Sequence, residues 1–160
     1  GGLFRVVGTR SRDAGLPVVY FDAAGVVRGA SVAEYQRGSF GVFEGLFFEG
    51  PGPHPHAAEW VFDFGRWTLM GHFNPAVARE MVSQVQDCFP ETIHRVFFIN
   101  YPASLKVAWK VVSPLVSKRT ALKMHWVESG KVAGAMRELV VDVDALPWEL
   151  RGEEGGGESA

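Results

Sequence analysis

The sequence predicts an α/β fold with a mainly parallel sheet, and two observations lead to this class. After position 58, short apolar runs of strand length alternate with helical patterns, as they do in chains of βαβ units. Asn74 and Pro75 begin one of these helical patterns, because Asn is a favourable N-cap and Pro suits the first helical position. The length of 160 residues is that of one domain.

Strands are expected where apolar runs are bounded by turn-forming residues. Their expected ranges are 3–7, 16–21, 59–64, 94–99 and 122–127. Residues 9–15 have the composition of a turn between the first two strands. Residues 50–56 are expected to form a loop, because repeated prolines remove backbone hydrogen-bond donors.

Helices are expected over residues 31–48, from Asn74 to the stop at Pro90, and over 103–112 and 129–139. The first is expected although it contains three glycines, each of which costs about 1 kcal/mol relative to Ala inside a helix. In the second helix, one apolar stripe is expected to consist of Val77, Met81, Val85 and Cys88.

Charge and cysteine content argue against several classes of protein. Sixteen basic and eighteen acidic residues leave a net charge of −2, whereas nucleic-acid binders usually carry a basic excess. Cys88 is the single cysteine, so an internal disulfide is excluded. No apolar run approaches the roughly 18–20 residues that span a bilayer, and the N-terminus does not read as a signal peptide. We therefore expect a cytoplasmic location. Because the sequence begins at Gly1 rather than Met, we expect a fragment or an incomplete gene model.

Catalytic and metal-binding motifs find little support. Asp63-Phe64-Gly65 matches the DFG motif of kinases, but the glycine-rich loop and the HRD segment of kinases are missing. His54 and His56 lie in the proline-rich loop without further ligands at metal-site spacing, which predicts solvated side chains. We expect no enzymatic activity, no metal and no cofactor.

Aromatic residues are abundant, with twelve Phe and five Trp. Such a content is typical of a densely packed core. It is also typical of an interior lined for a large apolar ligand, and composition alone leaves both interpretations open.

Sequence blocks between Trp60 and Val127 carry a more specific signal. In chain order they are Asp63-Phe64-Gly65-Arg66, Phe89-Pro90-Glu91-Thr92, Ile99-Asn100-Tyr101-Pro102, Trp109-Lys110-Val111-Val112-Ser113-Pro114 and Lys118-Arg119-Thr120-Ala121-Leu122-Lys123. Together they resemble the D-L-x-G, Y-P-E-R, I-N-A-P, W-K-x-x-K-P and D-P-x-T patterns of the CRAL-TRIO lipid-binding domain. The segments that begin at Gly15 and Leu146 resemble the opening and closing segments of that family.

The resemblance covers nearly the whole chain, with some departures. Tyr101 stands where the family has Ala, Arg151 replaces a Gly, and Ser117-Lys118 replaces Asp-Pro. The helical N-terminal subdomain that precedes this lobe in the family has no counterpart in the sequence. We therefore expect a CRAL-TRIO domain over residues 1–152 and a disordered, glycine-rich tail over 153–160.

The resemblance implies a sheet that forms the floor of an apolar lipid cavity and a mobile gate helix over residues 103–116. Such a cavity must be dry, because each buried CH₂ of an acyl chain contributes about 0.8 kcal/mol. The residues expected to line it are Phe62, Phe64, Phe97, Leu105, Trp109, Val112 and Val116, with Val61, Val96 and Phe98 also in the floor. Val107 and Val111 lie off this stripe and leave apolar surface for a membrane. An ordinary amphipathic surface helix is the alternative.

The resemblance also implies a headgroup-binding site formed by Glu91, Thr120 and Lys123. A lysine can neutralise a phosphate, and a carboxylate can accept hydrogen bonds from inositol hydroxyls. Choline-lipid members carry small hydroxyl residues at the positions of Ala58 and Trp60, so the sequence favours phosphatidylinositol over phosphatidylcholine. The alternative is that Glu91 only follows a helix stop and that Lys123 is a strand-edge charge.

The expected function is therefore the binding of a single phospholipid, and its transfer between membranes or presentation to a lipid kinase. A carrier of a tocopherol or a retinoid, and a scaffold domain with a vestigial cavity, are the alternatives. We expect a monomer that associates transiently and peripherally with membranes and does not bind nucleic acid. A group of basic residues is expected beside the gate helix, and it consists of Lys106, Lys110, Lys118 and Arg119. This group either attracts the domain to anionic membrane leaflets or is an ordinary solvated surface.

Overall fold

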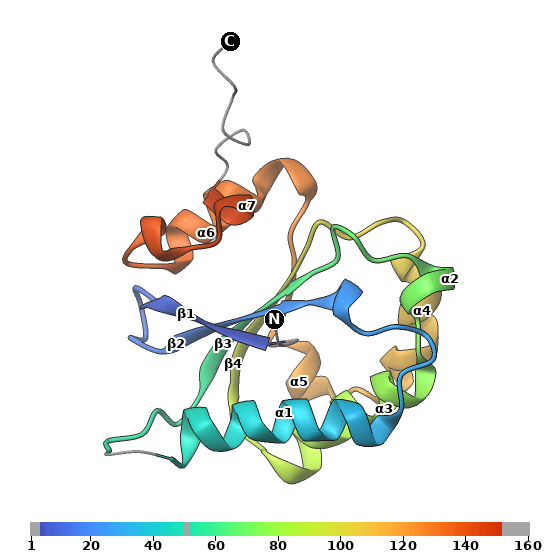
Figure 1. The fold of residues 1–160 in the computed structure, drawn as a ribbon. Coiled ribbons are helices and arrows are strands. Elements are labelled where there is room, and N and C mark those ends of the chain that lie inside the picture. The colour runs from blue at the N-terminus through green and yellow to red at the C-terminus, as the bar shows by residue number, and fades with distance from the viewer. Residues whose placement is uncertain (1–3, 50–51, 152–160) are drawn as a thin grey trace.

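The chain folds into a five-stranded sheet with helices on both faces (Figure 1). The computed structural model describes residues 4–49 and 52–151, so the expected tail lies outside the described residues. The strands are β1 (Phe4–Arg10), β2 (Pro17–Asp22), β3 (Ala58–Asp63), β4 (Ile93–Ile99) and β5 (Met124–Trp126). The helices are α1 (Val32–Phe47), α2 (Leu69–His72), α3 (Pro75–Ser83), α4 (Leu105–Val112), α5 (Lys118–Ala121), α6 (Val132–Leu139) and α7 (Trp148–Arg151).

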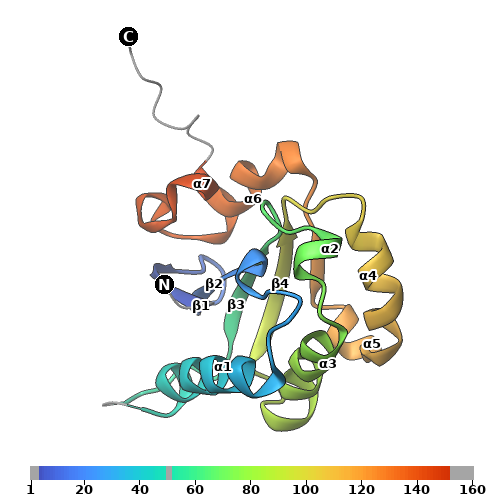
Figure 2. The ribbon, with the colours of Figure 1, turned by 45° about the vertical axis from the view of Figure 1, so that its right-hand side comes forward.

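The strands follow one another across the sheet in chain order. β1 pairs antiparallel with β2, and each later pair is parallel, which confirms the predicted α/β class. Crossovers between parallel strands are almost always right-handed. Because the strand order never reverses, right-handed crossovers place helices α1 to α5 on one face of the sheet (Figures 1 and 2). Helices α6 and α7 follow the last strand and cover the opposite face.

The pleat of the strands separates the apolar side chains into two cores. Trp60 and Phe98 face the crossover helices, together with the partly buried Phe62. Val61 and Phe97 pack instead with α6 on the opposite face, so their expected place in the cavity floor is wrong. The reason is that successive residues of a strand point to opposite faces, so direct neighbours cannot line the same cavity.

The helix expected over 31–48 is confirmed as α1, and it begins at a capping box. The Ser31 hydroxyl accepts the backbone N–H of Glu34, and the Glu34 carboxylate accepts that of Ser31 at 2.9 Å. The hydrogen bond from the Ser31 backbone lowers the pKa of the exposed Glu34. Tyr35, Phe43 and Phe47 are buried against the sheet, and this packing offsets the poor helix propensity of the glycines.

The helix expected from Asn74 is also present, but its last turn is wider than predicted. The Asn74 side chain caps α3 by accepting the N–H of Val77 at 3.2 Å. From Gln84 to Cys88 the chain forms a π-turn, in which Phe89 donates its N–H to the Gln84 carbonyl at 2.7 Å. The extra residue in this turn rotates the helix face, so the Cys88 side chain is exposed. The prediction that Cys88 belongs to the apolar stripe is therefore wrong.

The segment before β5 differs most from the prediction. The strand expected over 122–127 is reduced to the three residues of β5, and α5 precedes it. The Ser117 hydroxyl caps α5 by accepting the N–H of Thr120 at 3.2 Å. Ser is a favourable N-cap, and this local signal begins the short helix that carries Lys118 and Arg119.

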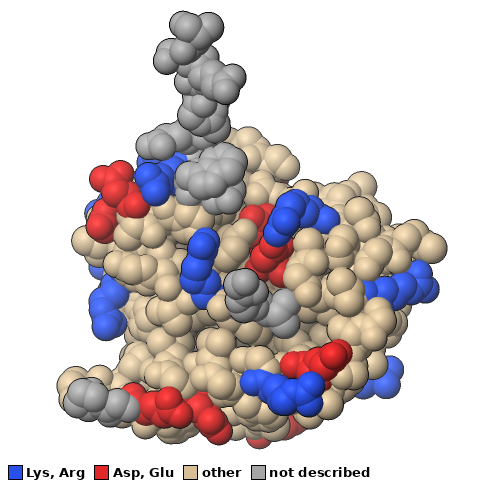
Figure 3. All heavy atoms as spheres, viewed as in Figure 1, with Lys and Arg blue, Asp and Glu red and all other residues tan. Residues whose placement is uncertain are grey.

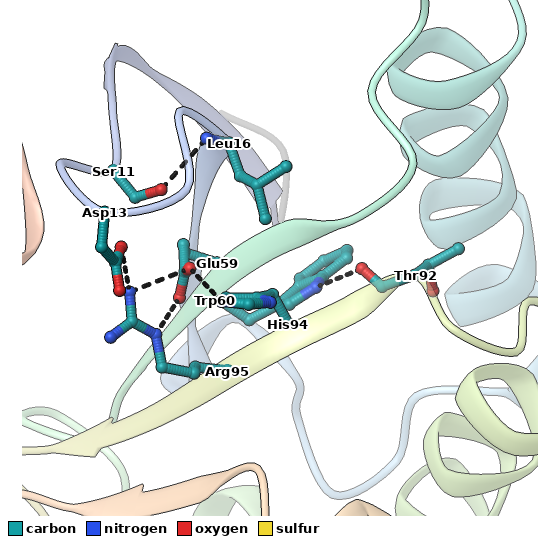
Figure 4. A network of polar contacts seen from close by, with 8 residues as sticks. All are labelled: Ser11, Asp13, Leu16, Glu59, Trp60, Thr92, His94 and Arg95. Carbon is teal, nitrogen blue, oxygen red and sulfur yellow. Dashed lines mark hydrogen bonds and ion pairs between the residues drawn. The ribbon is translucent and has the colours of Figure 1, made fainter.

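A polar network ties the turn between β1 and β2 to the middle of the sheet (Figure 4). The fully buried Glu59 carboxylate accepts hydrogen bonds from Arg95 at 2.8 and 3.0 Å. Arg95 also reaches Asp13 in the turn, at 2.8 Å. These contacts, above all the hydrogen bond to Glu59, raise the pKa of Arg95. Removing Arg95 would leave the buried Glu59 carboxylate without its charged partner, a change that typically costs about 3–5 kcal/mol.

Candidate functional site

A cavity lies between the sheet and the crossover helices. Its volume is about 170 Å³, within about 1180 Å³ of space between atoms that includes open solvent. Every strand contributes to its walls, as do α1, α3 and α4. The cavity is on the face that the right-handed crossovers cover, so the strand order determines on which side of the sheet it forms.

Aromatic side chains of neighbouring strands form the floor of the cavity. Phe21 of β2 and Phe62 of β3 have ring centroids 4.9 Å apart, and Phe62 meets Phe98 of β4 edge-on at 5.7 Å. Phe98 in turn stacks on Trp126 of β5 at 4.5 Å. Cross-strand pairs of this kind stabilise the sheet and also present a continuous apolar surface.

The opposite wall is formed mainly by α3 and α4. Val77, Met81 and Val85 of the predicted stripe line the cavity. The residues that were expected in the lining and are found there are Phe62, Phe64, Leu105, Trp109, Val112 and Val116. Phe97 is the exception, for the reason given above.

Helix α4 carries apolar residues on its outer face as well. Val107 and Val111 are 52% and 49% exposed, as expected for residues off the lining stripe. Leu115 and Leu122, which follow along the chain, are exposed too. α4 is therefore an apolar helix that faces the cavity on one side and solvent on the other.

The three expected headgroup residues come together at one edge of the cavity. Glu91 precedes β4, and its carboxylate lies 3.9 Å from the Nζ atom of Lys123, which precedes β5. Thr120 lines the cavity, and its carbonyl accepts the N–H of Lys123 at 3.0 Å. Lys123 itself lies outside the wall, with a side chain that is 25% exposed. The arrangement places two opposite charges at the amino ends of β4 and β5, beside the cavity.

Arg119 is the closer partner of Glu91, and the sequence did not indicate this pair. Its guanidinium lies 2.7 Å from the Glu91 carboxylate, and both side chains are exposed. Exposed ion pairs contribute roughly 0–1 kcal/mol, so these groups can exchange partners at little cost. Glu91 has a φ of 68°, a left-handed conformation that is uncommon for residues other than glycine.

Few polar side chains line the cavity: Tyr35, His72, Asn74 and Thr120. Asn74 donates to the carbonyls of Arg28 and Ala30 at 3.0 and 2.8 Å, and it also caps α3. Burial raises the pKa of the Tyr35 hydroxyl, an effect that a hydrogen bond with Ser39 opposes in part. The cavity is therefore suited to an apolar ligand with polar contacts at few points.

The two positions examined for choline recognition hold no hydroxyl. Ala58 is fully buried and lies outside the cavity wall. Trp60 lines the cavity, but its indole N–H donates to the Thr92 carbonyl at 3.3 Å. β3 therefore offers no hydroxyl to a ligand at these positions.

Charges on the surface of the molecule do not gather by sign on the face seen in Figure 3. Basic and acidic side chains of the described residues are scattered among uncharged ones there. In the part of the chain that the structure describes, no helix is long and apolar enough to cross a bilayer. Within the same residues, no group of three potential ligands is arranged to hold a metal ion.

Residues 7–152 match the family described as the CRAL/TRIO domain. The chain belongs to this family. The match covers nearly all the described residues of this CRAL/TRIO domain and confirms the family inferred from the sequence blocks.

Two relatives and one solved structure illustrate the relationship. The phosphatidylinositol/phosphatidylcholine transfer protein SFH4 of Arabidopsis thaliana is 34% identical over 74 residues, which are 44% of this chain and 12% of that protein. The phosphatidylinositol transfer protein sfh-5 of Neurospora crassa is 33% identical over 82 residues, 51% of this chain and 22% of that protein. The crystal structure of Sfh5 has the same fold, with a TM-score of 0.64 at 15% identity over 83% of this chain and 50% of that one. The chain thus spans less than a quarter of the length of these two curated relatives.

Proposed function

We propose that this domain binds a single phospholipid, with a preference for phosphatidylinositol, and carries it between membranes without chemical conversion. The observation that carries the proposal is an apolar cavity bordered at one edge by Glu91, Thr120 and Lys123. The apolar walls would replace the bilayer around the acyl chains, at about 0.8 kcal/mol for each CH₂ that is buried. The names of the two transfer-protein relatives support the same class of ligand.

The preference for inositol rests on the charges beside Thr120. Lys123 provides N–H donors for the oxygens of the inositol ring, Arg119 provides a cation for the phosphate, and Glu91 provides an acceptor for inositol hydroxyls. In the described structure these groups bind one another on the surface, so a headgroup would replace contacts that contribute little stability. The lack of hydroxyl groups at Ala58 and Trp60 speaks against a choline headgroup on β3.

Helix α4 serves as the gate in this proposal, and its outer face contacts the membrane. Val107 and Val111 offer apolar surface, while Lys106 and Lys110 are exposed on the same helix. Each cation near an anionic leaflet contributes roughly 1 kcal/mol to membrane attraction. The domain would therefore associate peripherally with anionic membranes and exchange its lipid there.

Replacement of Lys123 tests the headgroup site. Lys123→Ala should weaken phosphatidylinositol binding about ten- to hundredfold, because a charge-assisted contact of about 1.5–3 kcal/mol is lost. Phosphatidylcholine binding should hardly change, and the unmodified domain should prefer phosphatidylinositol over it. Competition between the two lipids for the purified domain measures both effects. Lys131→Ala is the matched control, since Lys131 is an exposed lysine whose ion pair is formed with the exposed Glu128.

Other outcomes of this experiment contradict the proposal in distinct ways. Unchanged binding of both lipids would make Lys123 a plain surface charge, and parallel losses with a lower melting temperature would make it a structural residue. Native mass spectrometry of the purified domain identifies the ligand directly. A co-purified tocopherol-like or retinoid-like molecule would favour the small-molecule carrier, and failure to bind lipid of any composition would favour a scaffold role.

A further inference from the structure

We infer that His72 is a second polar anchor of the cavity, at the opposite end from Glu91 and Lys123, and that it binds an uncharged oxygen atom of the ligand. The inference rests on the proposed function and adds a chemical requirement to the ligand. A hydroxyl, ketone or ester oxygen within the otherwise apolar part of the ligand would meet the imidazole N–H of His72.

The hydrogen bonds of α2 determine which nitrogen of His72 carries the proton. The backbone N–H of Thr68 donates to His72 Nδ1 at 2.9 Å, and the Thr68 hydroxyl lies 3.2 Å from the same nitrogen. Because Nδ1 accepts, the neutral ring carries its proton on Nε2. Arg28 holds the short helix in place by donating its N–H to the Gly71 carbonyl at 3.0 Å. The ring is therefore oriented by the backbone before any ligand binds.

His72 and Asn74 are the polar side chains compared at this end of the cavity, and within the described residues His72 has the unused hydrogen-bonding atom. Its ring is partly buried and lines the cavity beside Trp67 and Phe73. No hydrogen bond joins His72 Nε2 to any of the described residues, whereas every hydrogen-bonding atom of the Asn74 side chain has a partner. Isolated polar groups in apolar pockets are those that orient a ligand. A neutral imidazole offers a single N–H donor, which suits an uncharged oxygen acceptor.

The two polar ends lie far apart along the sheet. Glu91 and Lys123 precede β4 and β5, whereas His72 follows the carboxyl end of β3. The seven residues of β4 span about 20 Å between these ends, at about 3.3 Å per residue. Figures 1 and 2 show α2 and α5 well separated along the crossover-helix face. A lipid held at Lys123 would reach His72 only with an acyl chain, and a ligand with one polar group would bind at His72 alone.

Two pairs of probes distinguish these sources of the oxygen. One pair is phosphatidylinositol with a stearoyl or a hydroxylated stearoyl chain, and the other is farnesol with farnesene. The domain is incubated with equal amounts of both members of a pair and re-isolated by gel filtration, and the bound ratio is measured by mass spectrometry. We expect His72→Phe to lower the ratio of oxygenated to unmodified ligand about five- to tenfold in one of the pairs, the effect of about one hydrogen bond.

Matched variants complete the experiment. His54→Phe makes the same change in an exposed loop and should leave the ratio unaltered. His72→Gln keeps an N–H donor and should retain part of the preference, and His72→Leu replaces His72→Phe if the latter does not fold. An unchanged ratio in both pairs, or an equal fall in His54→Phe, overturns the inference but leaves the proposed function standing. If the unmodified domain retains none of the four probes, both are overturned.

Discussion

Phe97 and Phe98 are neighbours in β4, yet they belong to different cores. Phe97 stacks on His125 at 5.3 Å, and the Arg95 guanidinium lies 5.6 Å from its ring centroid. Phe98 contacts Trp126 and lies 6.2 Å from the Trp109 ring on the cavity side. At the scale of residues, the side chains of two adjacent strand positions point to opposite faces of the sheet. One of them thus stabilises the core under α6, and the other can contact a ligand.

The matched substitutions Phe97→Leu and Phe98→Leu test this separation. Both variants should fold and lose about 1 kcal/mol of unfolding free energy, since each swaps one large apolar residue for another. Only Phe98→Leu should alter lipid retention, because it changes the cavity floor. Urea unfolding gives the stability, and lipid bound after gel filtration gives the retention. Reduced retention in Phe97→Leu at unchanged retention in Phe98→Leu would contradict the assigned faces.

At the scale of elements, α4 is held to the sheet by side chains and anchored at its carboxyl-terminal end. Trp109 meets Trp126 edge-on at 5.2 Å, and Tyr101, a departure from the family pattern, meets Trp126 at 5.3 Å. Beyond the helix, Gln86 of the π-turn donates to the Leu115 carbonyl at 3.1 Å and accepts the N–H of Ser117 at 2.8 Å. In the described structure, α4 is therefore in contact with β5 through aromatic rings, and the segment after it is hydrogen-bonded to the π-turn.

Trp109→Asp should therefore abolish lipid transfer while the sheet still folds. A charge placed among Trp126 and the cavity floor is unfavourable unless it is hydrated, so the closed position of α4 is lost. Trp109→Phe is the control, because it keeps an aromatic ring at the same position. Transfer of labelled phosphatidylinositol between vesicles is the measurement, and circular dichroism reports the fold. Near-normal transfer by the Asp variant would show that α4 is not the gate.

At the scale of the whole molecule, the two sides of the sheet differ in how completely side chains fill the space between the sheet and the covering helices. The core beneath α6 is closed, with Met136 and Val140 fully buried. The other face encloses the cavity. A ligand that binds only the folded state stabilises it in proportion to its affinity and concentration, so the stability of this domain should depend on occupancy.

Removal of bound lipid should lower the melting temperature of the domain. A ligand at one hundred times its dissociation constant adds about 2.7 kcal/mol. For a domain of this size that corresponds to a shift of about 5–10 °C. Thermal unfolding of delipidated samples with increasing phosphatidylinositol would measure the shift, and Lys123→Ala should need a higher lipid concentration for the same increase. A melting temperature that does not respond to delipidation or to added lipid would contradict occupancy of the cavity.

The amino-acid sequence alone was sufficient to predict the α/β class, the family, and the order of the main strands and helices. Local signals suffice for these features, since Asn74 caps α3 wherever the helix packs and apolar runs predict strands without knowledge of their partners. The residues proposed to bind the headgroup are Glu91, Thr120 and Lys123, and they were predicted because they lie in blocks that resemble a known pattern.

The side chains that share a surface could not be predicted without the three-dimensional structure. Phe97 was assigned to the wrong face because a run of apolar residues does not reveal its phase relative to the sheet. Cys88 lies outside the predicted stripe because a π-turn rotates the end of its helix. The ion pair between Arg119 and Glu91 joins α5 to the residues before β4, and no local sequence signal indicates it. The position of His72 at the far end of the cavity has the same origin. The direction of a side chain depends on strand register and helix phase, and contacts between residues distant in sequence set both.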